Sequence, residues 1–120
     1  MLTEHKARQV EGEPTRRWFC DDLLDLLVWL DTQGTPLGFQ LCFQTGTQEL
    51  ALVWKKDEGF ANFKVDSGEE SPKKNLSPLL VEDGVFPSEE VSRSFRERSS
   101  EIDSPIRDFI LDKLENTPTT

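Results

Sequence analysis

The residues best suited to chemistry are three aspartates, Asp21, Asp22 and Asp25, in the stretch FCDDLLDLLVW at residues 19–29. On a helix, this DDxxD spacing could hold magnesium against a diphosphate group, because carboxylate oxygens are the ligands that magnesium prefers. On a strand, the same aspartates only border a hydrophobic segment. Whether this stretch is helical or extended therefore decides between an enzyme and a plain sheet protein.

The sequence that follows favours a strand. Three later segments, at 37–44, 49–55 and 60–66, alternate apolar and polar residues and are separated by turn-like stretches. With a four-residue loop at each turn, the apolar residues of all four strands share one face. In this register the apolar residues form rows of cross-strand partners. The rows are Leu24–Phe43–Leu50–Val65, Leu26–Leu41–Leu52–Phe63, Val28–Phe39–Trp54–Ala61 and, on the first two strands, Leu30–Leu37.

A helix at 21–31 would leave the segment 37–44 without this partner, so we predict a strand beginning near Leu23. Asp21 and Asp22 then lie at its start, and Asp25 points away from the core. No magnesium site is predicted, and the three aspartates are interpreted as solvated charges that discourage pairing at the sheet edge.

Two helices are predicted in the C-terminal third. Ser88 and Ser104 are good N-cap residues, and Pro105 suits the first helical position because it lacks a backbone N–H. The second helix carries apolar residues at the spacing of a buried stripe, namely Ile106, Phe109, Ile110 and Leu114. A single-domain sheet needs such a cover over its apolar face.

The predicted fold is therefore α+β, an antiparallel β-meander of four to six strands with two C-terminal helices packed on one face. The additional strands are expected at 15–19 and 79–82. A single domain is predicted over 15–116, with a flexible leader at 1–14 and a frayed tail at 117–120.

Composition excludes several functional classes. The net charge of −9 and the pI near 4.6 argue against nucleic-acid binding, which needs a clustered excess of Lys and Arg. The same charge disfavours attachment to anionic membranes, and no apolar run is long enough to span a bilayer. The start of the sequence lacks the apolar segment of a signal peptide, so we expect a cytoplasmic protein.

Residues suited to catalysis or to metal binding are few. Cys20 and Cys42 do not form a CxxC pair, and the one histidine, His5, lies in the polar leader. The glycines are isolated in turns, so no phosphate-binding loop is present. We predict no catalytic residues, no metal and no cofactor, and leave open whether the protein is an enzyme.

The face of the sheet opposite to the core is the most informative surface. Leu27, Trp29, Val53 and Phe60 make it more apolar than a wet face, and Trp29 is predicted to lie across from Gly38 and cover its backbone. One interpretation is a contact surface with contributions from Trp29, Gln40, Val53 and Phe60, used for a homodimer or another protein partner. The other is that residues 16–19 or 79–82 fold over it.

The RRWF segment at 16–19 supports a second hypothesis. Arg16, Arg17 and Trp18 could hold an anion in a pocket beside the sheet, with Gln40 and Cys42 on its floor, as in a ligand-binding protein or an enzyme. The structural interpretation is that Trp18 and Phe19 anchor the entry of the chain to the core and that the arginines pair with nearby carboxylates. A further hypothesis is that the acidic charge serves a basic partner.

Several segments together resemble a family of small bacterial proteins of unknown function. They are RRWF at 16–19, DLLVW at 25–29, GFQLC at 38–42, VW at 53–54 and DGVFP at 83–87. The resemblance covers about residues 16–115, and GFQLC is its most distinctive part. It implies no established activity, cofactor or partner.

Overall fold

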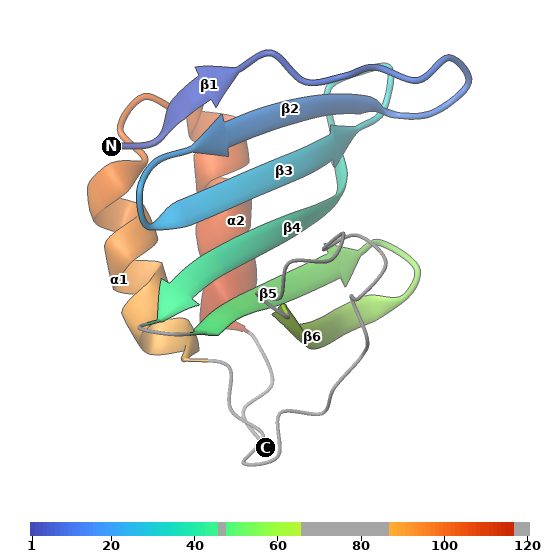
Figure 1. Cartoon of the computed structure of the whole chain (residues 1–120). Helices are drawn as coiled ribbons and strands as arrows, with labels where there is room; N and C mark the ends of the chain where they lie inside the picture. The colour runs from blue at the N-terminus through green and yellow to red at the C-terminus, as the bar shows by residue number, and fades with distance from the viewer. Residues whose placement is uncertain (46–47, 66–86, 117–120) are drawn as a thin grey trace.

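Six antiparallel strands follow one another across a single sheet in chain order (Figure 1). The computed structural model describes residues 1–45, 48–65 and 87–116. The strands are β1 (Thr3–His5), β2 (Thr15–Cys20), β3 (Leu24–Leu30), β4 (Pro36–Thr45), β5 (Gln48–Lys55) and β6 (Gly59–Val65). The predicted α+β meander is confirmed, and the strand expected at 15–19 is β2. The strand expected at 79–82 and the tail at 117–120 lie outside the described residues.

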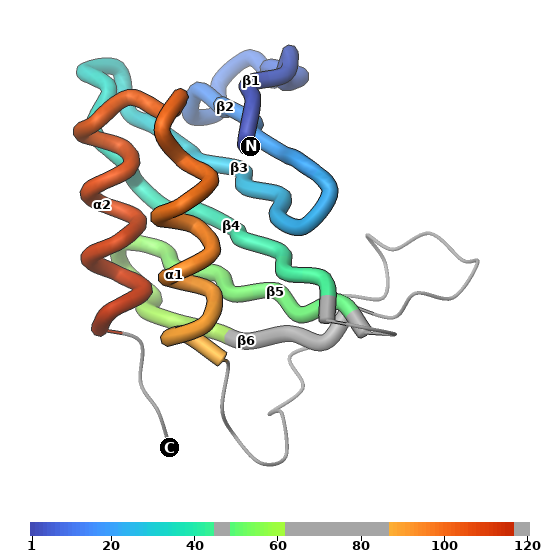
Figure 2. Tube along the Cα trace, turned by 90° about the vertical axis from the view of Figure 1, so that its left-hand side faces the viewer, coloured from blue at the N-terminus to red at the C-terminus, as the bar shows by residue number. Residues whose placement is uncertain are grey.

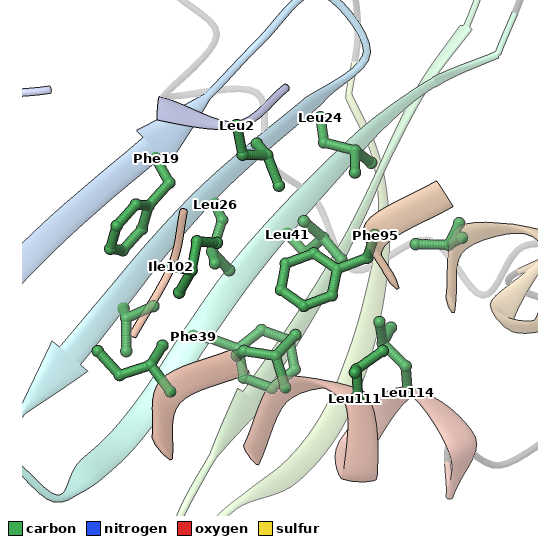
Figure 3. Close-up of a cluster of buried hydrophobic side chains, with 14 of the residues drawn as sticks. Leu2, Phe19, Leu24, Leu26, Phe39, Leu41, Phe95, Ile102, Leu111 and Leu114 are labelled. Carbon is green, nitrogen blue, oxygen red and sulfur yellow. The ribbon is translucent and has the colours of Figure 1, made fainter. Parts of the chain in front are cut away.

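Both helices lie against the same side of the sheet (Figure 2). They are α1 (Ser88–Arg98) and α2 (Ser104–Glu115). Their N-cap residues are Pro87 and Asp103, one position before the predicted serine caps. In the core between sheet and helices, Phe39 and Leu41 lie near Phe95, Leu111 and Leu114 (Figure 3).

The DDLLD stretch leads into a strand, as predicted. Along β3, the core-facing side chains of Leu24, Leu26, Val28 and Leu30 are buried and alternate with more exposed ones. Leu26 pairs with Leu41, which pairs with Leu52, so the predicted register between β3, β4 and β5 is confirmed. A one-residue slip would have turned these leucines away from the helices.

The register differs from the prediction at the end of β3. Leu30 pairs with Pro36 rather than with Leu37, because the ladder is irregular after Trp29. The Asp31 carboxylate accepts hydrogen bonds from two backbone N–H groups of the loop, at 2.8 and 2.9 Å. These hydrogen bonds hold the turn in place, and the extra residue on β4 forms a bulge beside it.

The predicted register of β6 is wrong by one residue. The loop before it has three residues instead of four, because Lys55 pairs with Gly59, which has a φ of 81°. A turn closed by Glu58 N–H on the Lys55 carbonyl, followed by a glycine at positive φ, is a common three-residue hairpin. Trp54 consequently pairs with Phe60, which packs against the core. The prediction that Ala61, Phe63 and Val65 pair with Trp54, Leu52 and Leu50 is therefore wrong. The partners of these three β5 residues are Phe60, Asn62 and Lys64.

The prediction of a flexible leader over 1–14 is wrong for its first residues. Leu2 is fully buried in the core, near Phe19 and Leu24 (Figure 3), and β1 pairs with β2. Further along, the Gln9 side-chain amide bonds to the backbone N–H and carbonyl of Arg16, at 2.9 and 2.8 Å. The leader therefore belongs to the domain, and its amide side chain occupies hydrogen-bonding groups at the edge of β2.

Candidate functional site

The candidate site is the face of the sheet turned away from α1 and α2, which we call the second face. Its middle is a band of cross-strand neighbours, the central row, which runs from β1 to β6. The members of the central row are His5, Trp18, Leu27, Gln40, Val53 and Ala61. Direct cross-strand partners share a face, so these side chains form one continuous strip.

Charged residues lie on either side of the central row. The basic end, defined by Arg16 and Lys55, is the row that also contains Trp29 and Gly38. The acidic end is defined by Asp25 and Glu49, with Asp25 between Cys20 and Cys42 on the neighbouring strands. The second face therefore changes from basic to acidic along the strand direction, across a central row that contains no Lys, Arg, Asp or Glu.

Trp18 is held in place by two neighbours. Its indole N–H donates to the Asp25 carboxylate at 2.6 Å, and the His5 ring lies 5.2 Å from the Trp18 ring. Leu27, the direct partner of Trp18 on β3, is half-buried. An aromatic side chain that is already fixed loses little conformational entropy when it is covered by a partner.

Trp29 covers bare backbone, as predicted. A Cβ atom at Gly38 would lie 2.7 Å from the Trp54 carbonyl oxygen and 3.4 Å from Cε3 of Trp29. Only glycine fits between these groups without movement of a strand. The absence of a side chain at Gly38 therefore allows β4 and β5 to approach closely at this point.

The two cysteines are poor nucleophiles. Burial raises the pKa of the Cys42 thiol to about 12, and the nearby negative charge of Glu49 adds to the effect. Burial and then the charge of Asp25 also raise the pKa of Cys20. Gln40 Nε2 lies 3.7 Å from the Cys42 sulfur. Because the thiolate is the reactive form, the raised pKa lowers the reactive fraction of each side chain at neutral pH, and more so for Cys42.

The sheet separates the two arginines of the RRWF segment. Arg17 lies on the helix side, across from Val28, and its guanidinium donates to Glu4 and to Asp103 at 2.8 Å. Those hydrogen bonds raise the pKa of Arg17. Arg16 lies on the second face and bonds to Glu13 at 2.9 Å.

The predicted pocket is therefore corrected in one respect. Arg17 cannot share a pocket with Gln40 and Cys42, because the sheet lies between them. The segment 16–19 is itself part of β2 and does not fold over the second face.

The three aspartates of the DDxxD spacing have separate roles. One Asp21 oxygen accepts from the N–H groups of Leu23 and Leu24 at 2.8 Å, and the other lies 2.9 Å from Arg98. Burial alone would raise the pKa of Asp21, but these hydrogen bonds and the positive charges of Arg98 and the Met1 amino group lower it to about 2. Asp22 also contacts Arg98, whereas Asp25 binds Trp18 on the second face.

Six of the predicted site residues lie together on the second face, namely Arg16, Trp18, Trp29, Gln40, Cys42 and Val53. Phe60 and Arg17 lie on the helix side. Sequence reasoning missed His5, which extends the central row onto β1. The three-residue strand around His5 is too short to give a periodic signal.

Searches for similar proteins return no match among protein-family models, curated proteins or solved structures. Within the described part of the chain, neither helix combines the length and apolarity needed to cross a membrane, and no group of three or more His, Cys, Asp or Glu residues is arranged to hold a metal ion.

Proposed function

We propose that the chain is a small cytoplasmic, non-catalytic binding or assembly module that contacts a protein partner through the second face of its sheet. The observation that carries this proposal is the central row, in which Trp18 is already fixed by Asp25 and His5. The described helices pack on the other side of the sheet, where they bury the core.

The residue types of the second face support a protein contact. Trp and Arg are enriched among the residues that dominate binding energy, and the second face has Trp18, Trp29 and Arg16 around the aliphatic Leu27 and Val53. Contiguous apolar surface with a charged border is typical of protein contacts.

The groups that would carry catalysis have other roles. The His5 ring lies at a tilt of 43° beside the Trp18 ring, and its Nε2 is 3.3 Å from the Thr3 hydroxyl. Burial keeps the Cys42 thiol protonated. Arg17 is engaged by two carboxylates. These contacts favour a binding protein over an enzyme that depends on a thiolate or on an anion-holding Arg17.

The alternative is a small-anion site at Arg16. One observation favours it, because Nε of Arg16 is buried and has no hydrogen-bond partner among the described residues. The same guanidinium donates one hydrogen bond to Glu13, so an anion would share Arg16 with that carboxylate. Titration with phosphate, followed by NMR at the Arg16 side chain, tests this alternative. Saturable shifts at micromolar phosphate would favour it over the protein-contact proposal.

Photo-crosslinking in living cells tests the proposed function. The photoreactive residue p-benzoylphenylalanine is placed at Gln40, in the middle of the central row, or at Arg93, an exposed position of α1. We expect a discrete covalent adduct from the position of Gln40 and none from that of Arg93. Adding Leu27→Lys to the Gln40 variant should abolish the adduct. No adduct from the second face, or equal adducts from both positions, would overturn the proposal.

A further inference from the structure

The charges of the second face are arranged so that the face complements itself. Lys55 and Asp25, at opposite ends, are both exposed, and Glu49 lies on the same strand as Lys55. The midpoint between Lys55 and Glu49 falls beside Val53, a member of the central row. Arg16 and Asp25 flank the same row on β2 and β3. One end of the face is therefore opposite in charge to the other; along β5, Lys55 lies two residues from Val53 and Glu49 lies four residues from it.

We infer that the partner of the second face is a second copy of this chain, packed face to face about a two-fold axis that runs along the central row. This inference rests on the proposed function and names its partner. In a two-fold contact the same surface serves both copies, so residue i meets j and j meets i. Rotation about this axis lays each strand antiparallel over its own counterpart and brings the basic end of one copy over the acidic end of the other.

Specific contacts follow from this geometry. Lys55 comes to lie over Ala51 of the second copy, about 7 Å along the strand from Glu49 and within reach of the long lysine side chain. The same pair forms again on the other side of the axis. Arg16 approaches Asp25 of the second copy. Arg16 retains donors for this contact because a guanidinium has five N–H groups, and the structure assigns one hydrogen bond from Nη2 to Glu13. Trp18, Leu27 and Val53 then meet their equivalents at the centre, where apolar burial is expected to supply most of the affinity.

The charges also choose between the two face-to-face arrangements that two-fold symmetry allows. An axis parallel to the strands would place the basic ends over each other and the acidic ends over each other. Like charges brought together across a contact oppose association. Only the axis along the central row pairs opposite charges.

The size of the face is compatible with a stable contact. The strands β2 to β6 lie about 4.8 Å apart with about 20 Å of each on the face, which gives about 500 Å² in projection. Side-chain relief increases this area toward the roughly 800 Å² per partner of a standard interface. Aligned sheets pack in this way in β-sandwiches.

Charge reversal on β5 tests the inference. In the dimer, Lys55→Glu makes both ends of β5 acidic and Glu49→Lys makes both ends basic, so each variant alone meets like charge. We expect each variant alone to dimerise about tenfold to thirtyfold more weakly than the wild type, because two symmetric pairs change from attraction to repulsion. An equimolar mixture should form a heterodimer, and the double variant K55E/E49K should recover wild-type affinity. Sedimentation velocity and native mass spectrometry distinguish these species.

Matched controls separate the specific contact from net charge. Lys56→Glu and Glu58→Lys make the same changes in net charge on the exposed loop beside β5, and neither should change the affinity. Far-ultraviolet circular dichroism checks that each variant is folded. Equal affinities for the wild type and both β5 variants would overturn the inference, and so would tighter association of K55E, which is the result expected for the parallel axis.

Different results would contradict the dimer and the proposed protein contact. A wild type that is monomeric at several hundred micromolar overturns the second-copy inference. In that case, an adduct formed at the position of Gln40 still supports a protein contact through the second face if its mass differs from that of a crosslinked dimer. Loss of both the dimer and the adduct overturns both.

Discussion

Asp21 is predicted to stabilise the fold through its negative charge. The substitution Asp21→Asn keeps the shape of the side chain and an oxygen that can accept from the N–H groups of Leu23 and Leu24. It removes the charge that faces Arg98 and the Met1 amino group. The decrease in the free energy of unfolding therefore measures the ionic contacts that join the β2–β3 turn to the end of α1.

The magnitude follows from proton linkage. The pKa of Asp21 is about 2 in the folded protein, against an ordinary value of 3.8. One pKa unit corresponds to about 1.36 kcal/mol, so the charged form contributes at most about 2.4 kcal/mol to the free energy of unfolding. The Asp21 side chain is only 6% exposed, but that of Arg98 is 31% exposed and screened by water. We therefore expect a loss of about 1–2 kcal/mol at pH 7.

The direction of the pKa shift determines how the stabilisation by Asp21 changes with pH. Because folding lowers the pKa, the stabilisation is fully present above about pH 4 and is lost as the pH falls through about 2. Urea unfolding of wild type and Asp21→Asn should differ at pH 7 and converge below pH 2. Asp22→Asn is the matched control, because Asp22 is 89% exposed and should contribute less than about 0.5 kcal/mol. A difference that is absent at pH 7, or that does not change with pH, would refute the linkage argument.

Three further predictions concern packing, register and thiol chemistry. Gly38→Ala should lower the free energy of unfolding by about 1–3 kcal/mol, measured in urea, because the new Cβ would lie 2.7 Å from the Trp54 carbonyl oxygen; a neutral result would contradict the close approach of β4 and β5. Phe60→Ala should destabilise the fold by more than about 1 kcal/mol, because Phe60 packs against the core, while Ala61→Ser should be nearly neutral in the same assay. Iodoacetamide at pH 8 should modify Cys20 faster than Cys42, whose pKa is about 12, as measured by peptide mass spectrometry; equal rates would argue against the burial of Cys42.

The central sheet could be predicted from the sequence because its residues allow only one register. Leu26, Leu41 and Leu52 meet on one face only if β3, β4 and β5 pair as they do. The register of β6 depends on the length of the loop before it, which has three residues and not four. The glycine at the end of KDEG is the signal for a three-residue loop, because Gly59 takes a positive φ that other residues adopt rarely.

The candidate site was partly predictable for the same reason. Alternation places Trp29, Gln40 and Val53 on one face once the register is known. It also places Arg17 on the same side as Phe19, so the separation of the two arginines could have been deduced from β2 alone.

Contacts that join distant parts of the chain have no local signal. The burial of Leu2 depends on β1 pairing with β2, and the pairing of Asp21 with Arg98 joins residues 77 positions apart. A strand of three residues has too little periodicity to be recognised before these neighbours are known.

The three tryptophans allow a direct test of the contact through the second face. Trp18 and Trp29 lie on the second face, whereas Trp54 packs on the helix side, with its ring 5.3 Å from that of Phe109. Fluorine NMR spectra of protein labelled with 5-fluorotryptophan can be recorded from micromolar to millimolar concentration. We predict that the Trp18 and Trp29 resonances shift with concentration while that of Trp54 stays constant. A shift of the Trp54 resonance alone, or three resonances that do not change, would contradict the contact between second faces.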